Sequence, residues 1–170
     1  VDQVDAMKRL VNEFRDYARL PAAELKPVDL NGLVSDVLHL YANEVTAVPI
    51  QAQLDTDCLP VLGDPQQLRQ VLHNLLQNAL DATESAGHQS AEHSVRVKTQ
   101  WLEPTARVRL SVLDNGTGFP EAILKRAFEP YVTTKSKGTG LGLAVVKKIA
   151  DEHRTRVDIV NRVIDGKVIG

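Results

Sequence analysis

The chain is poor in the features that would place it in several common protein classes. It has one cysteine among 170 residues, so it cannot form an internal disulfide, and a reducing compartment suits it. Aromatic residues make up only 4% of the chain, and no apolar run approaches the roughly 20 residues needed to span a bilayer. Neither sign of charge dominates, since 20 basic and 22 acidic residues give a net charge of −2. We therefore expect no nucleic acid among its partners.

The remaining composition is that of an ordinary globular domain, 43% hydrophobic and 25% charged. A chain of this length can bury a core without disulfides. We expect it to be a fragment of a longer protein. Val1 already lies in a helical pattern, and the chain stops soon after an apparent Asp165-Gly166 hairpin turn, where a returning strand should continue.

Residues 1–20 have the apolar spacing of an amphipathic helix. Apolar side chains recur at alternating intervals of three and four, at Val4, Met7, Val11, Phe14 and Ala18. This is the stripe of a bundle or coiled-coil helix. Pro21 should end the helix, and a short connector follows. The stripe fits a surface helix packed on its own domain, or half of a helical hairpin whose other half lies outside the chain.

The middle of the chain alternates between predicted helices and strands. A helix is expected over residues 29–45, and a strand from residue 49 to 54. Two further strands, 95–101 and 108–112, should form a hairpin across 102–106. The apolar face of the helix is predicted to contain Leu33, Val37, Leu40 and Tyr41.

The best-specified helix begins after Asp64. Asp64 is a good N-cap, Pro65 suits the first helical position, and Gln67 stands where a capping box has Glu or Gln. At about 100° per residue, three polar residues form a stripe along the edge of the apolar face. The apolar residues are Leu68, Val71, Leu72, Leu75, Leu76 and Ala79, and the polar ones are Asn74, Asn78 and Asp81.

Asn74 and Asn78 are the first candidates for chemistry. Two amides one turn apart, at the edge of a core face, need hydrogen-bonding partners. A hydrated Mg²⁺ with a triphosphate would supply them, because Mg²⁺ prefers oxygen ligands. Caps on neighbouring strands or loops would satisfy the same amides, so this pattern alone leaves both readings open.

Asp114 follows the second hairpin strand and opens the stretch Asp-Asn-Gly-Thr-Gly at 114–118. Such a stretch is typical of a tight turn. A carboxylate at this place could also accept a hydrogen bond from the exocyclic amine of adenine. Gly116 and Gly118 would then leave room for the base.

A second glycine cluster, Gly-Thr-Gly-Leu-Gly-Leu at 138–143, precedes a predicted buried helix over 141–153. Free N–H groups at a helix start can face phosphate, and Lys135 and Lys137 add positive charge nearby. The cluster is neither a Walker loop nor a dinucleotide fingerprint, and glycine hinges are common. A short helix over 120–128 and a strand beginning with Val157 and Ile159 complete the prediction.

Together the three motifs resemble the catalytic and ATP-binding domain of sensor histidine kinases. Asn-x-x-x-Asn-Ala-x-Asp-Ala at 74–82, Asp-x-Gly-x-Gly-Phe at 114–119 and the cluster at 138–143 match that family's N, G1 and G2 boxes. The stretch 128–135 looks like its aromatic box and ATP lid. The resemblance covers nearly all of residues 28–160 and is nearest to the nitrogen-regulation subgroup. Residues 7–21 look like that subgroup's second dimerisation helix.

The resemblance implies a two-layer α/β sandwich, a mixed sheet packed on helices, with a flexible ATP lid. Its implied boundaries are 1–21 for the end of the dimerisation and phosphoacceptor hairpin, 22–27 for a linker and 28–170 for the catalytic domain. Asn78 would bind Mg²⁺, Asn74 would support the metal and phosphates, and Asp114 would read adenine. These two asparagines are the implied catalytic residues. Further implied nucleotide contacts are Asp81, Gly116, Gly118, Tyr131, Thr134, Lys135, Gly138, Thr139, Gly140, Leu141 and Gly142.

The chain departs from the family pattern at two places. The phosphoacceptor histidine should lie before residue 1, since no histidine in the chain has the expected context. The family also often has Gly-Gly after the last helix, where this chain has Arg154-Thr155. This second departure leaves the local turn open.

The same fold is found in ATPases, which resemble this chain but carry Glu where Asn74 stands. Glu can take a proton from water, whereas an amide cannot. We therefore expect phosphoryl transfer to an imidazole rather than hydrolysis. An ATP-driven conformational clamp and a non-catalytic dimerisation or docking module are the alternatives.

The resemblance also implies partners and a location. The partners would be ATP with Mg²⁺, the protein's own dimerisation hairpin and the receiver domain of a response regulator, within a homodimer. The chain would be the cytoplasmic part of a parent anchored in the inner membrane.

Overall fold

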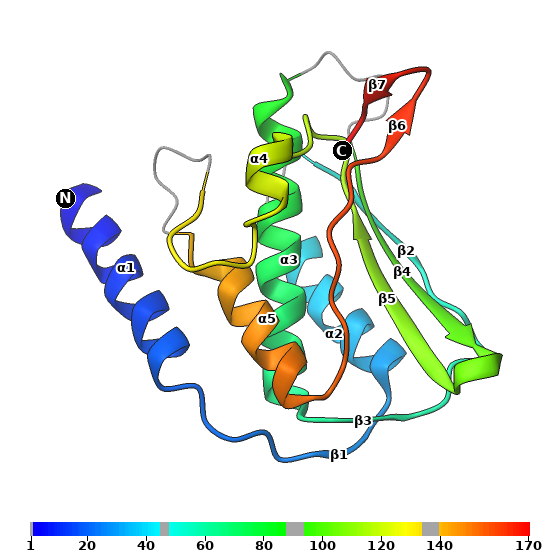
Figure 1. The fold of residues 1–170 in the computed structure, drawn as a ribbon. Helices are drawn as coiled ribbons and strands as arrows, with labels where there is room; N and C mark the ends of the chain where they lie inside the picture. The colour runs from blue at the N-terminus through cyan, green and yellow to red at the C-terminus, as the bar shows by residue number, and fades with distance from the viewer. Residues whose placement is uncertain (1, 45–47, 88–93, 134–139) are drawn as a thin grey trace. The chain divides into compact units, whose positions relative to one another are not determined.

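The computed structural model describes residues 2–44, 48–87, 94–133 and 140–170 (Figure 1). The chain forms two compact units. The smaller consists of Val1–Ala23 and Phe119–Val160, and the larger of Glu24–Gly118 and Asn161–Gly170. The predicted boundaries at 1–21, 22–27 and 28–170 follow function rather than compactness, and they stay a prediction.

The larger unit is built on a mixed three-stranded sheet. Its strands are β2 (Ile50–Gln53), β4 (Val95–Leu102) and β5 (Arg107–Leu113), in the order β2-β4-β5. β2 runs parallel to β4, and β4 pairs antiparallel with β5. The 3-10 turn η2 (Glu103–Thr105) joins β4 to β5. The predicted hairpin and the mixed sheet are therefore confirmed.

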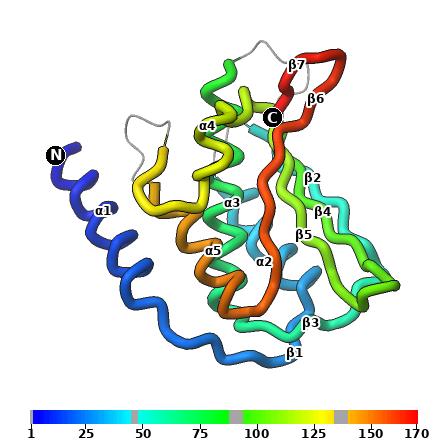
Figure 2. The backbone as a smooth tube through the Cα atoms, viewed as in Figure 1, coloured from blue at the N-terminus to red at the C-terminus, as the bar shows by residue number. Residues whose placement is uncertain are grey.

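Two helices, α2 (Leu30–Ala42) and α3 (Pro65–Ser85), cover one face of this sheet (Figures 1 and 2). Asp29 caps α2, because its Oδ1 accepts the Gly32 N–H at 3.1 Å. The prediction that Leu40 lies on the buried face is wrong, since its side chain is 67% exposed. Val34, which was not predicted to be buried, belongs to the buried face of α2 and is fully buried, whereas Leu40 lies outside that face.

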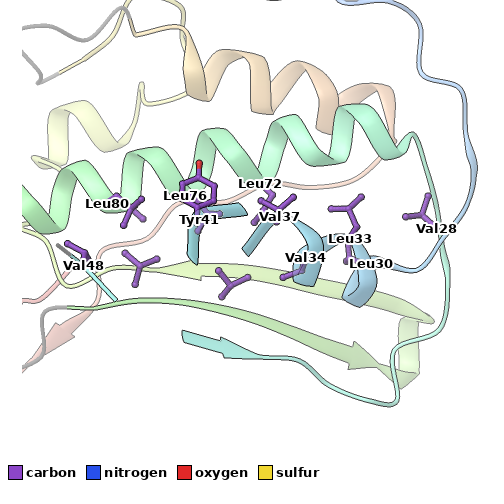
Figure 3. Packing of buried hydrophobic residues seen from close by; sticks show 13 residues of the cluster. Val28, Leu30, Leu33, Val34, Val37, Tyr41, Val48, Leu72, Leu76 and Leu80 are labelled. Carbon is purple, nitrogen blue, oxygen red and sulfur yellow. The ribbon is translucent and has the colours of Figure 1, made fainter. Parts of the chain in front are cut away.

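The core lies between these helices and the sheet (Figure 3). The buried face of α3 and the inward side chains of β4 meet the stripe of α2, as the helical and alternating spacings predict. The buried residues are Val28, Leu30, Leu33, Val34, Val37, Tyr41, Val48, Leu72, Leu76, Ala79, Leu80, Val95 and Val97. This unit is thus the two-layer α/β sandwich that the sequence predicts.

Two small strand pairs complete the larger unit. β1 (Lys26–Val28) pairs antiparallel with β3 (Val61–Gly63), which leads directly into the cap of α3. β6 (Val163–Ile164) and β7 (Lys167–Val168) form a hairpin across Asp165 and Gly166. These two residues have φ of 51° and 76°, the left-handed values that a type I′ turn requires. The predicted C-terminal turn is confirmed.

The smaller unit contains α1 (Asp2–Ala18), α4 (Glu121–Leu124) and α5 (Gly142–Glu152). Lys148 of α5 joins the end of α1, because its Nζ donates to the Tyr17 carbonyl at 2.6 Å and lies 4.9 Å from that ring's centroid. α4 is shorter than the predicted 120–128, and turns carry the chain on to Phe128. No described helix is long and apolar enough to cross a membrane.

α5 ends in a Schellman motif built on Arg154. The Thr155 N–H donates to the Ala150 carbonyl and the Arg154 N–H to the Asp151 carbonyl, both at 3.0 Å. Arg154 itself has φ of 51°, so it adopts the left-handed conformation that glycine usually supplies. The turn that the sequence left open is therefore made without glycine.

The strand predicted at Val157 and Ile159 is wrong, since the chain has no assigned strand from residue 155 to 162. Both side chains are half-buried and alternate with exposed neighbours. Alternation shows that a segment has two different faces, but a strand also needs a hydrogen-bonded partner.

Candidate nucleotide-binding site

α3 holds the two asparagines at a defined place because its start is capped. Asp64 Oδ1 accepts the N–H groups of Gln66 and Gln67 at 3.0 and 3.2 Å, and Pro65 begins the helix. The cap and the buried face together fix the rotation of the helix. Asn74 and Asn78 are consequently both half-buried at the edge of the core face, as the sequence predicts.

Asp81 continues the stripe and is also half-buried. Its Oδ1 accepts a hydrogen bond from Gln77 Nε2 at 3.1 Å. Among the described residues, no cluster of three or more His, Cys, Asp or Glu side chains could hold a metal. The amide oxygens of Asn74 and Asn78 are of the kind that Mg²⁺ accepts as ligands.

Asp114 stands directly after β5, as predicted, and its side chain folds back on its own turn. Oδ1 accepts the Gly116 N–H at 2.8 Å, which is an Asx turn. Burial raises the pKa of the Asp114 carboxyl, while the Gly116 N–H and the charge of Arg162 act in the opposite direction. The carboxylate is thus a partly desolvated acceptor that is held in one orientation.

Gly116 brings this turn against the end of α3. A Cβ added to Gly116 would lie 2.8 Å from the Ala82 carbonyl oxygen, so no larger residue fits without movement. Ala82 follows Asp81 directly and lies one turn after Asn78. The structure therefore brings the N-box and G1-box motifs together within the larger unit.

Gly118 has φ of 71°, and a Cβ there would meet Asn161 Oδ1 at 2.8 Å and Val168 Cγ1 at 2.6 Å. At both glycines, an added side chain would therefore meet neighbouring residues of the chain itself. Close packing explains why glycine is needed at 116 and 118, and the predicted role in admitting a purine base stays a prediction.

Arg162 also belongs to this region, although no sequence pattern singles it out. Its Nη2 donates to the Asp114 carbonyl oxygen and, at 2.8 Å, to Asn115 Oδ1. Arg162 is 48 residues away from Asp114 in the chain, and it belongs to no motif. Only the three-dimensional structure could have identified it.

The other predicted nucleotide residues belong to the smaller unit. Tyr131, with φ of 67°, donates its N–H to the Gly140 carbonyl at 3.0 Å. Gly140 has φ of 72°, and a Cβ there would lie 2.5 Å from the Tyr131 carbonyl carbon, so glycine is required. Leu141 is buried at the N-cap position of α5, and Gly142 is the first residue of that helix. Thr134, Lys135, Gly138 and Thr139 lie outside the described residues.

A cavity of about 570 Å³ is found at the opposite end of the β4–β5 hairpin from Asp114. It is lined by Asp55, Asp57, Leu59, Trp101 and Glu103. Asp55 stabilises the local structure there, because its carboxylate accepts the N–H groups of Trp101 and Asp57. These two hydrogen bonds lower the pKa of the Asp55 carboxyl. The full length of β5 separates this cavity from Asp114, so it is not part of the candidate site.

The sequence matches the family model described as histidine kinase-, DNA gyrase B-, and HSP90-like ATPase over residues 63–169. A sensor histidine kinase NtrY-like protein of Rickettsia bellii is 34% identical over 163 residues, which are 96% of this chain and 26% of the relative. The signal transduction histidine-protein kinase AtoS of Escherichia coli is 30% identical over 161 residues, 94% of this chain and 25% of the relative. The chain spans about a quarter of these relatives.

Solved structures agree with the sequence comparison. Full-length ShkA in complex with AMPPNP has a TM-score of 0.71 at 33% identity, over 89% of this chain and 32% of that chain. The catalytic domain of histidine kinase ThkA, in a nucleotide-free form, has a TM-score of 0.65 at 30% identity, over 85% of this chain and 91% of that one. Since the family model covers well over half of the residues and the fold agrees, the chain belongs to the histidine kinase-, DNA gyrase B- and HSP90-like ATPase family, and the relatives it is similar to are sensor histidine kinases.

Proposed function

We propose that this chain is the ATP-binding, catalytic part of a sensor histidine kinase, which transfers the γ-phosphoryl group of ATP to a histidine outside the chain. The observation that carries the proposal is the close approach of Gly116 to Ala82, because it joins the Asp114 turn to the end of the asparagine-bearing helix. An acceptor suited to adenine and amides suited to a hydrated cation thereby share one unit of the fold.

Asp114 is proposed to read the base. Its Oδ1 accepts the Gly116 N–H, and a carboxylate has a second oxygen that can accept a hydrogen bond from the exocyclic amine of adenine. The Asx turn fixes the plane of the carboxylate, which favours one orientation of the purine.

Asn74 and Asn78 are proposed to serve the phosphate end, Asn78 as a ligand of Mg²⁺ and Asn74 through the metal's waters and the phosphates. When bound, the cation neutralises charge on the phosphates during transfer. The phosphate contacts predicted for Tyr131, Gly140 and the N-terminal N–H groups of α5 concern residues of the smaller unit, and they stay predictions.

Transfer is favoured over hydrolysis because Asn74 cannot act as a base. A carboxylate at this position could take a proton from an attacking water molecule, and an amide cannot. In the proposed step, an imidazole nitrogen forms a bond to the γ-phosphorus while the bond to the bridging oxygen of ADP breaks. Positioning and charge stabilisation supply most of the rate enhancement in such reactions.

The partners follow from the same proposal. α1 would be the end of a dimerisation hairpin that carries the phosphoacceptor histidine, in a homodimeric and membrane-anchored parent with this part in the cytoplasm. A solved structure of the histidine kinase ThkA in complex with the response regulator protein TrrA has a TM-score of 0.73 at 25% identity, over 98% of this chain and 46% of that chain. It supports a receiver domain as the acceptor of the phosphoryl group.

Titration with a fluorescent ATP analogue tests the nucleotide site. We expect Asp114→Asn and Asn78→Ala each to weaken binding about tenfold or more, because each removes an interaction with a charged group. For Asn78→Ala the loss should appear only with Mg²⁺ present. Asp36→Asn and Asn12→Ala change an exposed acid and an exposed helical amide and should leave the affinity unchanged. Unchanged affinity in both site variants would remove the assignment.

The reaction is tested separately by mixing the chain with the missing dimerisation hairpin and γ-labelled ATP. We expect label on a histidine of the hairpin and slow release of phosphate by the chain alone. Brisk hydrolysis without any labelled histidine would favour the ATPase clamp instead.

A further inference from the structure

We propose that Arg162 is a positioning residue for nucleotide recognition, which holds the Asp114–Asn115 turn so that the Asp114 carboxylate faces the purine. The inference rests on the proposed function, in which Asp114 reads adenine. It adds a residue from the C-terminal hairpin to a site whose motifs all lie before residue 144.

The contacts that carry the inference go to the backbone as well as to a side chain. Arg162 Nη2 donates to the Asp114 carbonyl oxygen and to Asn115 Oδ1, the latter at 2.8 Å. The carbonyl of Asp114 stands just past the end of β5, and such a group needs a partner when it leaves the sheet ladder. Arg162 supplies that partner, and a guanidinium donor bonds a carbonyl more strongly than a neutral donor does.

The arginine is itself held in place. Its backbone N–H donates to the Gly170 carbonyl, and its carbonyl accepts the Ile169 N–H at 2.9 Å, which continues the β6–β7 hairpin. On either side of Arg162, Asn161 and Val168 approach Gly118 so closely that only glycine fits there. The hairpin therefore lies against the Asp114–Gly118 turn and presents Arg162 to it as a fixed group.

The turn needs such a support because its own sequence is permissive. Two of its five residues are glycine, and glycine leaves the backbone with many accessible conformations. The Asx bond from Gly116 to Asp114 orients the side chain, but it does not fix the Asp114 carbonyl. Arg162 fixes that carbonyl, and so sets the direction in which the Asp114 side chain leaves the strand.

The positive charge of Arg162 also acts on the Asp114 carboxyl, lowering a pKa that burial raises. This favours the ionised form, which is the stronger acceptor for an amine N–H. The effect agrees with the geometric argument and adds to it.

The test uses the full chain and two nucleotides, ATP and the analogue that lacks only the 6-amino group of the purine. We expect Arg162→Ala to weaken ATP binding about tenfold, the effect of one misplaced hydrogen bond. Binding of the analogue should change far less, because it has no amine for Asp114. Arg162→Lys should recover part of the loss, since both hydrogen bonds come from one nitrogen of the guanidinium. Lys167→Ala, at an exposed position of the same hairpin, is the matched control and should have no effect.

A second measurement needs no nucleotide. Hydrogen exchange of the Gly116 amide reports the Asx turn directly, and it should be faster in Arg162→Ala than in the parent and in Lys167→Ala. Thermal unfolding of each variant shows whether the fold is intact.

The outcomes separate the inference from the function on which it rests. If Asp114→Asn lowers ATP affinity and Arg162→Ala leaves both affinity and Gly116 exchange unchanged, the positioning role is overturned and the proposed function stands. An equal loss for ATP and the analogue in Arg162→Ala also overturns it, because the role would then be structural. If Asp114→Asn has no effect on ATP, Asp114 does not read adenine and the positioning role fails, whereas the proposed function fails only if Asn78→Ala is without effect as well.

Discussion

Asp114 illustrates at the scale of one residue how a partly buried carboxyl can cost stability. Its pKa is raised by burial, so the folded state disfavours the charged carboxylate. The contribution of Asp114 to stability is therefore most favourable below the ordinary carboxyl pKa near 4, and it is lost as pH rises through the raised value. A partly buried carboxyl with a raised pKa is a candidate for binding a ligand, which agrees with the role proposed for Asp114.

The first prediction follows from that sign. Asp114→Asn should stabilise the fold at about pH 7 by less than about 1 kcal/mol, because it removes a partly buried charge that Arg162 and Gly116 already offset in part. At about pH 3 the gain should vanish, since the parent carboxyl is then protonated. Urea unfolding at both pH values measures the difference. A variant less stable than the parent at about pH 7 would contradict the argument, and Asp36→Asn at an exposed position should show no gain.

Tyr41 gives a second prediction, at alkaline pH. Burial, with a smaller contribution from the nearby charge of Glu44, raises its pKa from 10.0 to about 12. The folded state thus favours the protonated phenol, and stability should be lost as pH rises from 10.0 towards about 12.

Tyr41→Phe removes that group and should abolish the alkaline loss. At neutral pH it should cost about 1 kcal/mol, because the Tyr41 hydroxyl lies 2.6 Å from His73 Nδ1 and this hydrogen bond disappears. Thermal unfolding across the pH range tests both effects. Tyr131→Phe, which changes an exposed phenol, is the control and should retain the parent's alkaline loss.

The sequence predicted single residues well where one residue's local chemistry decides its role. The cap at Asp64 and the place of Asp114 at a strand end could be read from neighbours a few positions away. Arg162 could not, because its partners are almost fifty positions distant. Gly116 and Gly118 were predicted to leave room for a base, which stays a prediction, and the contacts that the structure shows at them come from α3 and the C-terminal hairpin.

At the scale of elements, the end of α5 gives the clearest prediction. Arg154 holds a left-handed conformation with φ of 51° in a Schellman motif, and this conformation costs a side-chain-bearing residue about 1–2 kcal/mol. Arg154→Gly should relieve this cost, but glycine loses more backbone entropy on folding. The net gain in the free energy of unfolding should therefore be about 0.5–1 kcal/mol. Differential scanning calorimetry measures the gain. Arg156→Gly, two residues on, should give none, and a destabilised Arg154→Gly variant would disprove the account.

Elements were predictable where several local signals agreed. α3 has a cap, a proline at its start and a continuous apolar face, and the structure confirms it from Pro65 to Ser85. The strand expected at Val157 and Ile159 rested on alternation alone and was wrong. Pairing is a property of two segments, and the sequence of one segment does not reveal it.

At the scale of the whole molecule, the apolar stripe of α1 is exposed. Val4, Met7 and Val11 are 55%, 67% and 61% exposed, and no residue of α1 is buried. A contiguous apolar face of this kind marks an interaction surface. The occupant we propose is the companion helix of the dimerisation hairpin, or a second copy of this helix when the companion is absent.

The isolated chain should therefore self-associate at high concentration. Sedimentation velocity should show a concentration-dependent shift for the parent, and the double variant Met7→Glu and Phe14→Glu should remain monomeric. Leu62→Glu changes an exposed apolar residue on β3 and should leave the association intact. A parent that stays monomeric at millimolar concentration would refute the role of the stripe.

The sequence alone predicted the separate motifs of the candidate site better than it predicted that they form one site. Helical spacing, turn residues and glycine clusters each indicate one part, and each part taken singly has a structural explanation as well. It was the order of the three motifs, through resemblance to a family, that predicted one site. The asparagines and Asp114 do share the larger unit, while the second glycine cluster belongs to the smaller one.

The contact between Gly116 and Ala82 limits how this protein can change over evolutionary time. A larger residue at Gly116 would force the acidic turn away from the helix, so drift at this position is restricted although glycine has no reactive group. If Asp114 reads the base as proposed, new base preferences would arise more readily by exchanging the acid itself than by reshaping the loop around it.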